Sequence, residues 1–582
     1  MNVKERTELM GVARGEAKAD LLLRGAKIVN VYSGELLDGD VAVYGGRIAF
    51  VGDAHRLQAA EVHEMGGRYL APGLVEPHAH PWILYNPRSY AQALLPRGVT
   101  TAVADDLPLR AAYGAEGLGP VLGALSSLPL RYYWLLRIGF YGPMEMAHDG
   151  PGEAILPLEE VAEALRIPGV LGIAELNRWL SVLPAPQEIL DAFSLARARG
   201  QIVQGHTSGA SAAQLNLLAL SGIDSCHEAI TAEEVLTRLR LGLYTMLRHS
   251  SLRPDLPQLL PALQMPDVDT SRIMLTTDGS SPAHIAREGH IDGMVERLLT
   301  AGIPPVRALQ MATRNPAVYL GLDAEVGGIA PGRHADLVVL DDLDRFRPQE
   351  VYVGGRKVAQ FGALTVPVPE LNWTDLGRVE GYRLPRDLRA EELLLPWQED
   401  VTAISFYNSV LTRNEQLRLP ARAGSFDLSS QPALLYATVV ARDGRFLSRG
   451  LVKGLLRDVG GFATSYTLNG HLLALGSSAE DMLRALQEVA GRGGGFAHVQ
   501  DGVLCWFLPL QLLGGMRTGS FDDAVEASRE LESFARSHGY AFEDPAYSLH
   551  FLEGDFLPGP RLTARGVVDA KSGRVIYPSI QR

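Results

Sequence analysis

The stretch Ala71–Trp82 reads APGLVEPHAHPW, an apolar run after a Pro-Gly turn that ends in two histidines one residue apart. Successive side chains of a β-strand point to opposite faces, so His78 and His80 can face one ion together while Ala79 points away. The pattern therefore predicts a buried strand whose carboxyl end carries two ligands of a metal site.

Seven more strand-like runs follow this one, separated by segments that are compatible with helices. Eight alternations of strand and helix over about 250 residues are typical of a (β/α)8 barrel. We therefore predict an α/β fold class whose main body is this barrel, over residues 71–325. The eight runs end at His80, Asp106, Phe140, Glu175, His206, His227, Arg248 and Asp278.

The segments on either side of the barrel share one texture of short alternating strands punctuated by glycine. Residues 1–70 and 326–365 are each too short to close a good core, so we expect them to form one composite β-sandwich. Residues 366–399 are polar and rich in proline and are predicted to be a linker. Residues 400–582 mix strands with helices and are predicted to be a C-terminal α+β domain.

The composition excludes several classes of protein. A net charge of −13 leaves no basic stripe for a phosphate backbone, so no nucleic acid is expected as a partner. No run reaches the roughly 18 apolar residues of a membrane span, and the N-terminus carries charges throughout, so we expect a cytoplasmic protein. The two cysteines are too few for a disulfide framework or a four-cysteine zinc site.

Residues that can bind a metal follow several of the predicted strands. The carboxyl ends of barrel strands converge on one mouth, so these side chains are expected to lie close together. Nitrogen and carboxylate ligands suit zinc, iron or manganese, and the set is large enough for one ion or two. A single histidine at a strand end is more often a core residue, but this explanation does not suit the whole set of His78, His80, Asp105, Glu175, His206, His227 and Asp278.

The lysines constrain how two ions could be bridged. Barrel hydrolases of this kind often use a carboxylated lysine, but none of the six lysines lies between His78 and Leu322. A lysine bridge and Schiff-base chemistry from within the barrel are therefore excluded. If a bridge exists, Glu175 at the end of the fourth strand is placed to form it.

Such a site predicts a hydrolytic reaction. A divalent ion lowers the pKa of its bound water from about 15.7 to about 7, which generates hydroxide at neutral pH. Asp278, after the last strand, is expected to accept the proton of this water and to pass it to the leaving group. The predicted reaction is hydrolytic attack on an electrophilic carbon.

Several segments resemble the adenine deaminases of the amidohydrolase superfamily. The most specific are SGIDSCHEAITAEEVL at residues 221–236 and EGHID at residues 288–292, and the segment ATSYTLNGHLLALG resembles the family's extra C-terminal domain. The resemblance covers nearly the whole chain. It implies a purine salvage enzyme, a homodimer or larger, in which metal-activated hydroxide attacks the purine carbon that carries the exocyclic amine, converting adenine to hypoxanthine.

The resemblance also implies roles for individual residues. It assigns Glu175 as the bridging carboxylate and Asp278 as both a catalytic residue and a metal ligand. Glu228 matches a family residue that protonates or hydrogen-bonds the ring, although a solvated carboxylate at a helix start explains its position equally well. The metal ligands that the resemblance implies are His78, His80, Glu175, His206, His227 and Asp278.

Two segments depart from the family pattern. Residues 105–109 read DDLPL where the family has a DPHE-like run, and residues 467–471 read TLNGH where it has an HDSHN-like run. Apolar and aromatic residues near the amine favour a bulkier leaving group, so an N-alkylated adenine such as N-methyladenine is a candidate substrate. The aromatic residues after the histidine pair have packing of the barrel rim as their alternative role. The residues expected to contact the base are Trp82, Tyr85, Asp105 and Arg248.

Two other functions stay open. A cyclic amide hydrolase shares the barrel and the water chemistry, although its usual dinuclear form needs the lysine bridge that this barrel lacks. A non-catalytic metal-binding descendant is the other alternative, and the presence of Asp278 argues against it.

Overall fold

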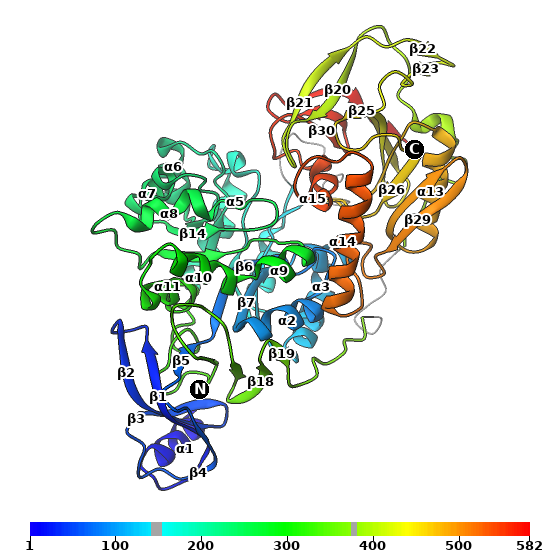
Figure 1. Ribbon diagram of the computed structural model, residues 1–582. Coiled ribbons are helices and arrows are strands. Elements are labelled where there is room, and N and C mark those ends of the chain that lie inside the picture. The colour runs from blue at the N-terminus through cyan, green and yellow to red at the C-terminus, as the bar shows by residue number, and fades with distance from the viewer. Residues whose placement is uncertain (141–153, 374–380) are drawn as a thin grey trace.

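The computed structural model describes residues 1–140, 154–373 and 381–582. Residues 374–380 of the predicted linker and residues 141–153 of the predicted barrel range lie outside this part. The barrel occupies the middle of the molecule, with a β unit that contains the N-terminus on one side and the C-terminal domain on the other (Figure 1).

The barrel contains the eight strands that the sequence predicts. They pair in parallel in chain order, and a bridge between Ala79 and Asp278 joins the last strand to the first. The (β/α)8 prediction is therefore confirmed. The strands are β6 (Leu74–Ala79), β7 (Val99–Asp105), β8 (Arg131–Leu136), β11 (Val170–Ile173), β12 (Ile202–Gly205), β13 (Ser225–Cys226), β14 (Tyr244–Arg248) and β15 (Ile273–Thr276).

The third strand is shorter than predicted. We expected it to run to Phe140, but β8 ends at Leu136, and Gly139–Phe140 forms the separate short strand β9, paired with β10 (Ala154–Ile155). The strand ends early because the side chain of Arg137 is bound by buried acidic residues at the mouth of the barrel.

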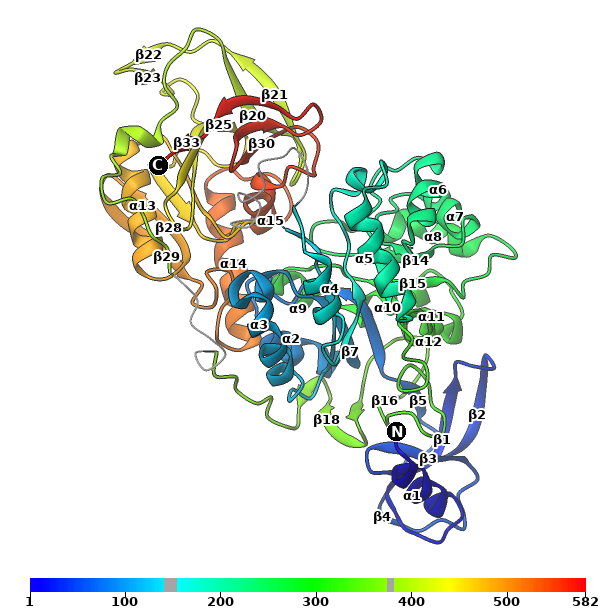
Figure 2. The same ribbon diagram turned by 180° about the vertical axis from the view of Figure 1, so that it is seen from behind.

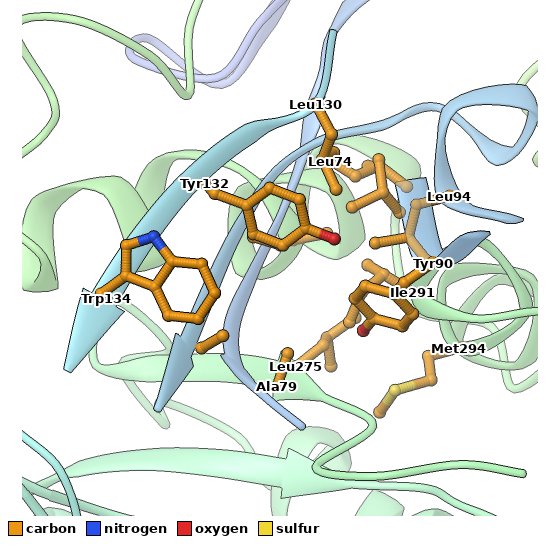
Figure 3. Close-up of a cluster of buried hydrophobic side chains, with 14 of the residues drawn as sticks. Leu74, Ala79, Tyr90, Leu94, Leu130, Tyr132, Trp134, Leu275, Ile291 and Met294 are labelled. Carbon is orange, nitrogen blue, oxygen red and sulfur yellow. The ribbon is translucent and has the colours of Figure 1, made fainter. Parts of the chain in front are cut away.

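Helices surround the strands and bury apolar side chains against them. In Figure 3, Leu74, Ala79 and Leu275 of the strands lie beside Tyr90 and Ile291 of the helices, within one buried cluster. Burial of such side chains is the main stabilising contribution to the fold. The helices are α2 (Pro87–Leu94), α3 (Leu107–Leu125), α4 (Leu158–Ala164), α5 (Gln187–Ala198), α6 (Ala212–Ser221), α7 (Ala232–Arg240), α8 (Leu256–Gln264), α9 (Pro282–Glu288), α10 (Ile291–Thr300), α11 (Pro305–Ala312) and α12 (Arg314–Tyr319).

The two flanks of the barrel meet in one nine-stranded sheet, where we expected a composite sandwich. The strand order is β19-β18-β17-β16-β5-β1-β2-β3, with β4 beside β1. The flanks are joined where β16 pairs antiparallel with β5. Helix α1 (Val3–Ala13) precedes β1 (Ala19–Asn30), β2 (Glu35–Tyr44), β3 (Arg47–Gly52), β4 (Ala59–Glu64) and β5 (Tyr69–Pro72), and the second flank supplies β16 (Leu337–Leu340), β17 (Glu350–Val353), β18 (Arg356–Gln360) and β19 (Ala363–Leu364).

The C-terminal domain is built on a second nine-stranded sheet, which includes β20 (Val401–Phe406), β24 (Leu434–Val440), β25 (Phe446–Lys453) and β27 (Leu472–Gly476). The predicted hairpin is present, with β28 (Gly495–Gln500) and β29 (Val503–Pro509) joined at Asp501 and Gly502, both with positive φ. Helix α13 (Ala479–Gly491) ends at the glycine-rich run, which is therefore a helix stop.

Helix α14 (Phe521–Ser537) connects the C-terminal domain to the barrel. It packs against α9 and α2, and both views show it running from the C-terminal sheet down to the barrel (Figures 1 and 2). Helix α15 (Pro545–His550) and the short helix η5 (Phe551–Glu553) follow it. Within the described residues, no helix combines the length and the apolar character that crossing a bilayer requires.

Candidate active site

The two histidines of β6 face a common point at the barrel mouth. The Nε2 atoms of His78 and His80 lie 3.2 Å and 2.9 Å from Oδ1 of Asp278. Gln204 accepts a hydrogen bond from His78 Nδ1 at 2.7 Å, because the amide nitrogen of Gln204 donates to the Pro77 carbonyl. This contact fixes the tautomer of His78 and leaves Nε2 free to bind a metal.

A second group of ligands adjoins the first. Oε2 of Glu175 lies 2.9 Å from Nδ1 of His206 and 3.2 Å from Nε2 of His227. The rings of His78 and His227 stack with their centroids 4.2 Å apart, so the two groups share one buried centre. The barrel has thus brought together all six predicted metal ligands.

The donor set fits a divalent metal. Three groups of donors have ligand atoms within 4.8 Å of one another, and each group combines imidazole nitrogens with a carboxylate. Burial and the neighbouring His227 lower the pKa of His78, which favours the neutral imidazole that metal binding requires. The groups are His78, His80 and Glu175; His78, His227 and Asp278; and Glu175, His206 and His227.

Glu76 ties the first strand to the last. Its fully buried carboxylate accepts hydrogen bonds from the backbone of His78 at 3.0 Å and from the hydroxyl of Thr276 at 2.6 Å. The Thr276 hydroxyl also accepts from the backbone of Asp278 at 2.9 Å, where φ is +58°. Glu76 therefore holds a ligand from each end of the barrel. The sequence reasoning missed it, although it stands within the EPHAH run.

The family-specific EGHID segment supports the same region from behind. His290 is buried, and its Nε2 accepts a hydrogen bond from the hydroxyl of Tyr90 at 2.7 Å. The same nitrogen lies 3.0 Å from Oγ1 of Thr277, whose hydroxyl donates to Glu76. The segment thus contributes through the Glu76 network and does not itself supply a metal ligand.

Two arginines hold the acidic residues of the site. Arg248 forms ion pairs with Glu228 and with Oδ2 of Asp278, the latter at 2.7 Å. Arg137 bridges Oδ2 of Asp105 at 2.5 Å and Oε1 of Glu175 at 2.9 Å. The sequence reasoning missed Arg137, because it expected the third strand to end at Phe140.

Glu228 is a buried carboxylate. It is 2% exposed, so it is not the solvated helix-start residue that its position in the sequence also allowed. Burial raises the pKa of a carboxyl group, but Arg248, His206 and Arg253 together lower the pKa of Glu228 well below its usual range. The ionised group is therefore a hydrogen-bond acceptor at the mouth of the barrel.

The aromatic residues after the histidine pair have different surroundings. The ring of Trp82 is half-buried, and its centroid lies 5.4 Å from that of His80. Tyr85 is 1% exposed, and its hydroxyl donates to the carbonyl of Ser280 at 2.9 Å. Trp82 thus lies beside a metal ligand, whereas Tyr85 has the rim-packing role that was its alternative.

The two segments that depart from the family pattern lie at different distances from the site. Asp106 of the DDLPL run accepts a hydrogen bond from the backbone of Arg137 at 2.7 Å and therefore supports the centre directly. The TLNGH run is one layer further out, because the backbone of Asn469 donates to Glu553 of the C-terminal domain at 3.0 Å.

A closed parallel barrel with buried histidines and carboxylates at its carboxyl end defines a metal-dependent hydrolase of the amidohydrolase type. The Amidohydrolase family model matches residues 69–358, and the model of the Adenine deaminase C-terminal domain matches residues 409–574. The chain belongs to the adenine deaminase family.

Individual relatives match over the full length. A chain from Halalkalibacterium halodurans is 33% identical over 100% of this chain and 98% of its own. The adenine deaminase of Cenarchaeum symbiosum is 32% identical over 97% of this chain and 93% of its own, and that of Moorella thermoacetica is 31% identical over 98% and 97%. The similarity therefore spans the barrel, the flanking sheet and the C-terminal domain.

Proposed function

We propose that this protein catalyses the metal-dependent hydrolytic deamination of adenine or a related 6-aminopurine. The products are hypoxanthine, for adenine, and ammonia or an amine. The observation that carries the proposal is the convergence of four histidines, Glu175 and Asp278 in one buried centre at the barrel mouth. Membership of the adenine deaminase family supports a 6-aminopurine as the substrate.

The side chains around the centre suit this chemistry. A bound divalent ion supplies activated water at neutral pH. Arg248 holds one oxygen of Asp278, so the other oxygen faces the centre and is placed to accept the proton of the water and to pass it to the leaving amine. Glu228, held as a carboxylate, is placed to accept a hydrogen bond from a ring N–H of the base.

The direct test is metal analysis of the purified protein followed by product assays. Adenine, N-alkylated adenines, guanine derivatives and cyclic amides are supplied separately, and ammonia, amine and base products are measured. We expect hypoxanthine and ammonia from adenine, and no turnover after the metal is removed. Turnover confined to cyclic amides would support the alternative hydrolase, and a metal-loaded protein without any turnover would support a non-catalytic descendant.

We further propose an N-alkylated adenine, such as N-methyladenine, as the preferred substrate. The apolar ring of Trp82 beside His80 supports this preference, together with the loss of the family's histidine and glutamate from residues 105–109. The test compares kcat/KM for ammonia release from adenine with that for methylamine release from the methylated base. Much faster ammonia release would end this proposal.

The metal and the assembly are also proposals. The nitrogen and carboxylate donors support manganese, iron or zinc, as one ion or as two that share Glu175. The expected homodimer or larger assembly and the cytoplasmic location stay predictions. Light scattering of the purified protein and fractionation of cells check them.

A further inference from the structure

A short piece of the C-terminal domain covers the barrel mouth. We call residues 544–556, which contain α15 and η5, the cap segment; α15 lies between the C-terminal sheet and the barrel in Figure 1. Asp544 at its start accepts a hydrogen bond from the hydroxyl of Ser251 at 2.6 Å. Asp555 near its end accepts one from Nε of Arg178 at 2.9 Å.

The cap segment reaches the metal ligands themselves. The ring of Phe556 meets the ring of His206 edge-on, with centroids 6.3 Å apart. The loops that follow β11, β12 and β14 are therefore all in contact with the C-terminal domain. This contact puts side chains from a distant part of the chain within reach of any base bound at the mouth.

Tyr547 of α15 lies against the residue that follows Asp278. Its ring stacks on Phe551 with centroids 5.4 Å apart, which fixes the ring's direction. Its hydroxyl oxygen packs on Gly279 so closely that a Cβ atom at Gly279 would lie 2.0 Å from it. No other side chain than glycine fits at this position beneath the hydroxyl.

The hydroxyl of Tyr547 has no hydrogen-bond partner among the residues that the structure describes, although the side chain is only 7% exposed. Other tyrosines of this region have theirs: Tyr85 donates to Ser280, and Tyr540 of the same domain donates to Glu543. Buried hydroxyls are almost always satisfied, so an unsatisfied one beside a catalytic carboxylate indicates a place for a ligand.

We propose that Tyr547 completes the substrate pocket from the C-terminal domain. Its hydroxyl hydrogen-bonds a nitrogen on the edge of the purine that carries the amine, because this edge faces Asp278 and the hydroxyl lies on the next residue. Tyr547 is thus a specificity residue, and the C-terminal domain takes part in recognition of the base. The inference rests on the proposed function, since the ligand is taken to be a 6-aminopurine.

The test is Tyr547→Phe in the metal-loaded, full-length protein. The substitution removes only the hydroxyl, which stabilises nothing in the protein itself, so the midpoint of thermal unfolding is expected to stay the same. With the best 6-aminopurine substrate, kcat/KM is expected to fall about tenfold, chiefly through KM, because a hydrogen bond to the base is lost. The affinity for hypoxanthine, measured by calorimetry, is expected to fall in parallel.

Tyr540→Phe is the matched control. Its hydroxyl is satisfied within the C-terminal domain by Glu543 and by Ser548 at 2.6 Å, so we expect a lower unfolding midpoint and unchanged kcat/KM. Equal KM, kcat and hypoxanthine affinity in wild type and Tyr547→Phe would overturn the role of Tyr547. A wild-type enzyme that deaminates no 6-aminopurine would instead contradict the proposed function, and the calorimetric comparison would still decide whether Tyr547 contacts a purine.

Discussion

At the scale of single residues, the site depends on contacts that orient the ligands. His78 offers Nε2 to the centre because Gln204 occupies its other nitrogen, and Asp278 offers one oxygen because Arg248 occupies the other. The ligands themselves could be predicted, since a strand that ends in His-Ala-His has one evident use. Gln204 could not, because a glutamine within a strand carries no signal of its own in the sequence.

Asp278→Asn tests the proton transfer. The amide cannot accept the proton of the attacking water, so we expect kcat to fall by about 10²–10⁴-fold, measured as release of ammonia or amine at saturating base. Metal content is measured on the same preparation, to separate proton transfer from loss of the ion. Asp336→Asn, which breaks a buried ion pair with Arg131 away from the site, serves as the control and keeps its activity per folded molecule. Unchanged turnover in Asp278→Asn would remove Asp278 from the mechanism.

Gln204→Leu tests the orientation of His78. Without the acceptor at Nδ1, His78 no longer holds one tautomer, and we expect metal affinity to fall by about 10–100-fold in a chelator competition assay. Gln201→Leu is the matched control, because Gln201 donates only to the carbonyls of Leu165 and Val170. Equal metal affinity in the two variants would contradict the assigned role of Gln204.

At the scale of elements, the first and last strands together carry the proton acceptor and two of the ligands. The Ala79–Asp278 bridge closes the barrel, and Glu76 of β6 binds the residues that end β15 and follow it. Strand periodicity predicts both strands, since alternation and flanking turns are local properties. The early end of β8 was missed, because the partners of Arg137 lie on β7 and after β11, and only the closed barrel brings them near.

Thr276→Val tests this link between the strands. The substitution removes a donor to Glu76 and an acceptor for the backbone of Asp278, both within the core. We expect the free energy of unfolding to fall by about 1–3 kcal/mol, measured by denaturant titration.

Thr245→Val on the neighbouring β14 is the control for that experiment. The hydroxyl of Thr245 is buried without a partner among the described residues, so its loss is expected to be neutral or stabilising. Equal destabilisation in the two variants would show that the hydroxyl of Thr276 contributes no more than its burial.

At the scale of the whole molecule, the barrel and the C-terminal domain share their apolar cores. Leu84 of the barrel lies in the buried cluster of the C-terminal domain, and Phe521, Val525 and Tyr547 lie in that of the barrel. The C-terminal domain is therefore part of the structure that supports the site. The resemblance to adenine deaminases predicted that such a domain exists, but only the packed structure assigns it a place over the barrel mouth.

Metal removal tests the coupling of the centre to global stability. An ion that binds only the folded state stabilises it by about 4 kcal/mol at a thousandfold excess over its Kd. We therefore expect the thermal unfolding midpoint to rise by several degrees when manganese, iron or zinc is added back to chelator-treated protein. Sulfate salts of magnesium and sodium at equal ionic strength are the control, and a midpoint that responds equally to them would contradict a specific site.

The eight strands, the ligand types and the absence of a barrel lysine could be read from the chain, because strand periodicity and residue identity are local properties. The partners of those ligands were decided by the tertiary structure. Arg137, Gln204 and Tyr547 act through atoms that come from distant segments; the hydrogen bond between Ser251 and Asp544, for example, joins residues 293 positions apart. No local pattern encodes such a contact, since it arises only when the barrel closes and the cap segment packs over its mouth.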